Sequence, residues 1–265
     1  MSTFEEPPVL SPDGHEFVGR IFDLSIISLH FETLEEANRW DDVRYLLPID
    51  GRVTLLVNRV ESLNRIADFL WLPEKFVQSD QLPCSAWDWL NATLDSFLAR
   101  FVSILDCCLL LARDVFEMGI PDRKVTIGAI ETKGAPAELI QRFKQLRTHS
   151  EEMRDERNER FHAAYEREFS SAPMTFKNAS ILSHRGIRMT GEDENGNTLD
   201  VDRYFSEGLE QLKEVFVAAV SELDDHLDAV HDFLLVEFNR RFHEKFNDPI
   251  KGYGRNTMNT RSKQV

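Results

Sequence analysis

The segment from Arg157 to His162, with the sequence Arg-Asn-Glu-Arg-Phe-His, combines residue types that could cleave RNA without a metal. The guanidinium of Arg157 is permanently charged and can bind a phosphate through two parallel hydrogen bonds. The imidazole of His162 titrates near neutral pH, so it could take the proton of a ribose 2′-hydroxyl or give one to the leaving oxygen. Asn158 could orient that imidazole or contact the phosphate. We therefore expect Arg157, Asn158 and His162 to be catalytic, with no metal or other cofactor.

Helix geometry places these side chains on different faces. Asn158 and His162 are one turn apart on a regular helix, with Arg154 a turn earlier. Arg157 lies about 140 degrees around the axis from His162. The two could converge on one phosphate if the helix bends locally, or if two copies of the helix pair across a two-fold axis. The second arrangement predicts a composite site in a homodimer.

The segment resembles the signature of the HEPN superfamily in its form RNxxxH, late in a long bundle helix. The resemblance implies an all-helical bundle that dimerises with both motifs facing a shared cleft. It also implies a metal-independent endoribonuclease that leaves 2′,3′-cyclic phosphate and 5′-hydroxyl ends. Such proteins belong to toxin–antitoxin, abortive-infection and other antiviral defence systems, so an antitoxin or sensor protein is a further expected partner.

Three more residues near the motif are candidates for RNA binding: Arg154, Arg160 and Tyr165. Some HEPN proteins carry a tyrosine two residues after the histidine, which a partner nucleotidyltransferase can adenylylate. Here Ala164 holds that position and the tyrosine follows it. The family's regulation through this tyrosine is therefore not expected.

Other interpretations of the same residues stay open. Arg157 could form a structural salt bridge, and His162 could be a histidine that contacts a neighbouring helix. The chain would then be a catalytically inactive helical module that binds RNA or a protein partner through the same cleft. The acids available to Arg157 are Glu151, Glu152, Asp155, Glu156 and Glu159.

A metal site is a third interpretation. An acid and a histidine three residues apart occur at Glu159–His162 and at Asp228–His231, as in di-iron bundles. Such bundles also need an inward carboxylate from each of the other two helices. The run from Asp224 to Asp228 is explained more simply as a solvated acidic face.

Composition limits the class of protein. The 265 residues carry a formal net charge of −15, which argues against a non-specific nucleic-acid coat, so any RNA contact must be local. Three cysteines without a CxxC pair argue against a disulfide framework or a thiolate zinc site. The N-terminus does not resemble a signal peptide, and the most apolar stretch, Ile104 to Ala112, is too short to span a bilayer. We expect a cytoplasmic protein with no membrane partner.

Helical patterns dominate the rest of the chain. A long helix is predicted from Ser85 until Gly119 and Pro121 end it, because apolar residues recur at alternating steps of four and three. Ala135-Pro136 is expected to open a helix that continues into the Arg157 segment. There an arginine occupies a position at which the apolar pattern predicts a core residue. A last helix is predicted from Phe205 to Phe238 and on toward Phe246.

The N-terminal part is less regular. Residues 20–31 are rich in isoleucine and leucine, and a strand or a short buried segment both fit them. Thr33 and the following acids predict a short helix through Tyr45 that stops before Pro48. A second helix is expected from Arg52 to Leu70.

Strand-like sequences on either side of the tight-turn signal Glu194-Asn195-Gly196-Asn197 predict a β-hairpin at about 176–202. The expected fold is mainly α, an antiparallel bundle of about four long helices with this hairpin inserted. We expect an N-terminal extension at 1–50, a HEPN-like bundle at 51–247 and a flexible basic tail at 248–265.

Overall fold

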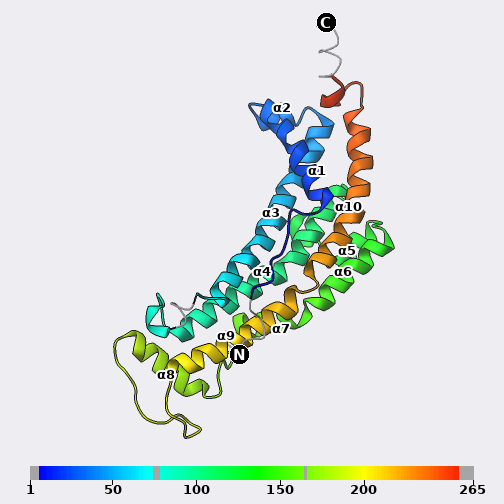
Figure 1. Cartoon of the computed structure of the whole chain (residues 1–265). Coiled ribbons are helices and arrows are strands. Elements are labelled where there is room, and N and C mark those ends of the chain that lie inside the picture. The colour runs from blue at the N-terminus through cyan, green and yellow to red at the C-terminus, as the bar shows by residue number, and fades with distance from the viewer. Residues whose placement is uncertain (1–5, 74–77, 164–165, 257–265) are drawn as a thin grey trace. The chain divides into compact units, whose positions relative to one another are not determined.

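The computed structural model describes residues 6–73, 78–163 and 166–256 (Figure 1). These residues belong to two compact units. The first unit comprises Met1–Leu10, Glu61–Val102 and Ser150–Glu222. The second comprises Ser11–Val60, Ser103–His149 and Leu223–Val265. The expected extension, bundle and tail follow other boundaries and stay a prediction.

Helices are the regular elements of the described residues, and the predicted mainly α fold is confirmed. The α-helices are α1 (Glu16–Ser25), α2 (Leu34–Ala37), α3 (Asp41–Leu70), α4 (Ala86–Val115), α5 (Ile127–Thr132), α6 (Ala137–His149), α7 (Glu151–Ala163), α8 (Pro173–His184), α9 (Val201–Val220) and α10 (Leu223–Phe246). Short 3₁₀ helices lie at Ile26–His30, Ser79–Gln81 and Asp122–Lys124. Within these ranges, no helix combines the length and apolar character needed to cross a membrane.

The predicted β-hairpin is wrong. Residues expected to form its first strand lie in α8, which places Phe176 and Ala179 in the core at helical spacing. These strand-forming residues adopt a helix because helical spacing buries part of the segment in the core, and burial outweighs intrinsic propensity. The tight turn itself is confirmed, since Gly196 has φ 76° and its N–H donates to the Asp193 carbonyl. It closes a loop with a single β-bridge, between Glu192 and Thr198.

Helix boundaries also differ from the predictions. The N-terminal isoleucine-rich segment forms α1 and a 3₁₀ turn rather than a strand, with the His15 side chain accepting a bond from the Phe17 N–H as a cap. Thr33 caps α2 as expected, but this helix ends at Ala37. The next helix, α3, continues through Pro48 because its apolar face stays buried on both sides of the proline.

Two helices predicted to be continuous are interrupted. The helix expected to carry Arg157 ends as α6 and restarts as α7 after Ser150, where the buried apolar stripe also ends. The expected last helix is divided into α9 and α10. The Ser221 hydroxyl donates to the Ala218 carbonyl there, a local bond that competes with helix continuation.

The core of the first unit contains an aromatic cluster that joins α4 to α8. The Trp87 ring meets Phe169 and Phe176 edge-on, at centroid distances of 5.3 and 5.7 Å. Gly208 lets α9 approach α4, because a Cβ there would lie 2.4 Å from Cδ1 of Leu90. These contacts fix the part of α4 on which α7 rests.

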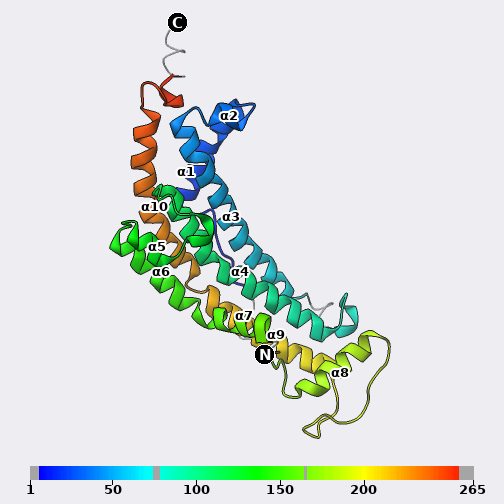
Figure 2. The ribbon, with the colours of Figure 1, turned by 180° about the vertical axis from the view of Figure 1, so that it is seen from behind.

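In the second unit, α1 and α6 each pack against α10 (Figure 2). Phe238 of α10 stacks on Tyr45 at 5.7 Å and meets Phe17 edge-on at 6.1 Å. The first residues of the expected flexible tail are anchored here, since the buried Asp42 carboxylate accepts hydrogen bonds from the N–H groups of Tyr253 and Gly254. Residues 257–265 lie outside the described part.

His231 is a buried titratable group in this unit. Its side chain is 3% exposed, and neither ring nitrogen has a hydrogen-bond partner among the described residues. Burial, with a smaller contribution from the charge of His15, lowers the pKa of His231 from 6.5 to about 4. The imidazole is therefore neutral in the folded protein at physiological pH.

This burial predicts acid sensitivity. The unfolded chain takes up a proton near pH 6.5 and the folded chain only near pH 4, so His231 should cost stability as the pH falls through this window. Wild type should lose about 3 kcal/mol more than His231→Leu between these limits. Urea unfolding across the pH range measures the difference, and His243→Leu, an exposed histidine of α10, should retain the wild-type slope. Equal slopes for wild type and His231→Leu would refute the assignment.

Candidate functional site

The predicted catalytic segment lies in α7, a helix with no buried residue. Glu151 and Glu152 in its first turn and Arg160 and His162 in its last turn complement the helix dipole. An apolar stripe is missing, so polar contacts must hold α7 on the first unit. The orientation of the motif depends on those contacts.

Arg160 supplies the main contact. Its Nε donates to Oδ1 of Asp95 at 2.7 Å and its Nη2 donates to Oδ1 of Asn91 at 2.9 Å, both on α4. The Arg160 side chain is only 6% exposed. Arg160 thus anchors α7, and its expected contact with RNA stays a prediction.

Arg154 and Arg157 are held differently. Both are half-buried, and the Nε of each is buried without a hydrogen-bond partner. Across the described residues, neither guanidinium has an ion pair, and none of the five acids considered from the sequence pairs with Arg157. Glu156 is engaged instead by Arg167, whose Nη1 lies 3.0 and 2.9 Å from its two carboxylate oxygens. Unsatisfied buried donors are costly, so an anion would bind there favourably.

The remaining motif residues diverge from Arg157. Asn158 is half-buried, whereas His162 is exposed on the same side of α7 as Asp155 and Glu159. Helix α7 is continuous from Glu151 to Ala163, so no interruption of the helix brings Arg157 and His162 together. Tyr165 lies outside the described residues. One chain therefore presents the phosphate-binding and proton-transfer groups on separate faces.

The opposite side of α7 is strongly acidic. A hollow of about 510 Å³ is lined there by Glu152, Asp155, Glu156, Glu159, Glu166, Arg167, Glu168 and Gln211. Six carboxylates would repel a phosphate backbone. Any RNA must therefore reach the motif from the side of Arg154 and Arg157.

The di-iron interpretation gains nothing from the structure. In the ranges described, no group of three metal-ligating side chains includes Glu159, His162, Asp228 or His231. Asp228 is exposed while His231 is buried, so this acid and histidine do not face a common centre.

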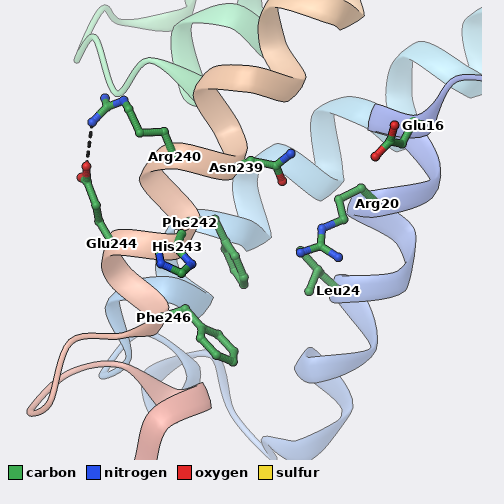
Figure 3. A pocket seen from close by; sticks show the side chains of 9 residues that line it. All are labelled: Glu16, Arg20, Leu24, Asn239, Arg240, Phe242, His243, Glu244 and Phe246. Carbon is green, nitrogen blue, oxygen red and sulfur yellow. Dashed lines mark hydrogen bonds and ion pairs between the residues drawn. The ribbon is translucent and has the colours of Figure 1, made fainter.

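The second unit contains a cavity of about 750 Å³ between α1 and α10 that the sequence did not predict (Figure 3). Phe242 and Phe246 point into it from α10, and Arg20 reaches toward them from α1 (Figure 3). The sequence left residues 20–31 undecided between a strand and a buried segment. It therefore could not predict that a helix at these residues packs against α10.

Comparisons with protein-family models, with curated proteins and with solved structures found no match. The HEPN resemblance therefore depends on the motif and its helical setting alone.

The contacts of α7 predict different roles for two arginines. Arg160→Ala leaves Asp95 and Asn91 without their partner, so the free energy of unfolding should fall by about 1–2 kcal/mol. Arg157→Ala removes a side chain that makes no such bond and should change it by less than about 0.5 kcal/mol. Urea unfolding followed by circular dichroism compares them. Equal losses for both variants would contradict the assignment.

The unpaired guanidinium groups predict a local RNA contact. Arg154→Ala and Arg157→Ala should each weaken binding of a single-stranded RNA oligonucleotide and reduce its salt slope by about one. Titrations by fluorescence anisotropy at several salt concentrations measure both quantities. Arg142→Ala, an exposed arginine of α6, serves as the control and should bind as wild type. Unchanged RNA affinity in both α7 variants would show that RNA does not bind this face of the helix.

Proposed function

We propose that this chain is a metal-independent endoribonuclease of the HEPN type, active as a homodimer in a defence or toxin system. The observation that supports it most is the Arg157 guanidinium, whose Nε is buried without a partner while the adjacent Glu156 is bound by Arg167. A structural salt bridge to Arg157 would instead have favoured an inactive module.

The proposed reaction uses three side chains. Arg157 binds the scissile phosphate, and Asn158 supports the phosphate or the imidazole. The 2′-hydroxyl attacks phosphorus as its proton leaves, and the bond from phosphorus to the 5′-oxygen breaks as that oxygen gains a proton. His162 performs one or both proton transfers. The products are a 2′,3′-cyclic phosphate and a 5′-hydroxyl.

The divergence of Arg157 and His162 on α7 is the reason to propose a dimer. A regular helix separates them by about 140 degrees, so one helix cannot direct both at one phosphate. Two α7 helices related by a two-fold axis can combine Arg157 of one chain with His162 of the other.

The same divergence also favours a second candidate, an inactive module that binds RNA or a protein through α7. Its supporting observation is the acidic hollow, which restricts RNA to one side of the helix. The two functions differ in whether His162 is needed for cleavage.

Cleavage of total RNA in excess EDTA tests the proposal. Wild type should leave cyclic-phosphate ends, whereas Arg157→Ala and His162→Ala should be inactive. His184→Ala, an exposed histidine of the first unit, is the matched control and should cleave as wild type. Equal cleavage by all four proteins would indicate another site or a contaminant. Failure of folded wild type to cleave, with RNA binding retained, would favour the inactive module.

Mixing the two inactive variants tests the composite site. A heterodimer of Arg157→Ala and His162→Ala chains contains one intact pairing of arginine and histidine, so refolded mixtures should recover about a quarter of wild-type activity. A site contained in one chain predicts no recovery.

A further inference from the structure

The motif of α7 has a partial second copy in α10. Four of five positions are identical between the α7 segment Asn158-Glu159-Arg160-Phe161-His162 and the α10 segment Asn239-Arg240-Arg241-Phe242-His243. The identical residues are the asparagine, the arginine at the third position, the phenylalanine and the histidine. The residue before the asparagine differs, since it is Arg157 in α7 and the buried Phe238 in α10. The α10 copy therefore lacks its own phosphate-binding arginine.

Arg20 of α1 takes the place of that arginine. It lines the same cavity of about 750 Å³ as Asn239 and His243, which are one helical turn apart on α10 (Figure 3). Arg20 is exposed, and no hydrogen bond or ion pair engages its guanidinium within the described residues. A cation, an amide and an imidazole thus border one cavity of a single unit, an arrangement that α7 lacks.

The other lining residues add an aromatic surface and little opposing charge. Phe242 and Phe246 lie 5.7 Å apart between ring centroids, and both rings point toward α1 (Figure 3). Glu244 is neutralised by Arg240, whose Nη1 lies 2.9 Å from its Oε1, and Glu16 remains as the one acid of the lining without such a pair among the described residues. Cavities of this size with an apolar floor and a few convergent polar groups suit a small ligand.

We propose that the cavity between α1 and α10 binds a nucleotide, free or as part of single-stranded RNA. Arg20 binds the phosphate, and His243 and Asn239 donate hydrogen bonds to the phosphate or the ribose. The base lies against the half-buried ring of Phe246, which packs beside the buried Phe242, since aromatic side chains are the usual platforms for unstacked bases. This site is independent of the proposed ribonuclease, because none of its residues belongs to α7.

Isothermal titration of the full chain with adenosine monophosphate tests the proposal. Wild type should bind one nucleotide, and Arg20→Ala and His243→Ala should each bind at least tenfold more weakly. Arg142→Ala should bind as wild type, because Arg142 is an exposed arginine that does not line the cavity. Unfolding curves recorded beforehand establish that each variant is folded, and both substituted side chains are exposed.

Three results would overturn the proposal. One is no binding to folded wild type at millimolar nucleotide. Another is loss of binding in Arg157→Ala with full binding in Arg20→Ala, which would move the anion site to α7. The third is equal affinity for inorganic phosphate and the nucleotide, which would leave the aromatic rings without a role. Failure of RNA cleavage alone would not affect this site, so the two proposals fail separately.

Discussion

The ion pair between Arg160 and Asp95 is the interaction on which the candidate site depends. Helix α7 buries no side chain completely, so the hydrophobic effect does little to orient it. The Arg160 side chain, which is 6% exposed and bonded to Asp95 and Asn91, fixes the rotation of α7 on α4 instead. Once Arg160 is fixed, helix geometry places Arg154 and Arg157 beside it and His162 away from it.

Charge on α7 is divided between its two sides. The carboxylates gather around one hollow, and Arg167 holds Glu156 there. The arginines occupy the other side, two of them without an ion pair in the described part of the chain. A protein with a net charge of −15 can bind a phosphate only where such a division exists, because its overall field repels nucleic acid.

Local sequence patterns predicted the elements that bury a continuous apolar stripe. Helix α4 follows its steps of four and three. The buried stripe that leads toward Arg157 ends earlier than the pattern predicted, at Ser150, because α7 has no buried residue. The breaks at Ser150 and Ser221 were not predicted, because they depend on packing and local side-chain bonds rather than on periodicity. The strand-like residues near Ile181 predicted a hairpin wrongly, because the burial of Phe176 in the core selects a helix for this segment.

The partners of the candidate site were beyond sequence analysis for a different reason. Asp95 precedes Arg160 by 65 residues, and Arg20 is more than 200 residues from His243. No helical pattern connects such pairs. The second copy of the asparagine–histidine spacing was present in the sequence, but its importance depends on α1 being a helix that faces α10.

The most direct test of the account is the state of the Arg157 side chain. Arginine Nε–Hε signals can be followed by nuclear magnetic resonance while a single-stranded RNA oligonucleotide is added. We expect the Arg154 and Arg157 signals to move and to become protected from exchange, whereas the signal of Arg160, whose Nε is already bonded to Asp95, should stay in place. An Arg157 signal that is protected before RNA is added, or that never responds to it, would contradict the central claim.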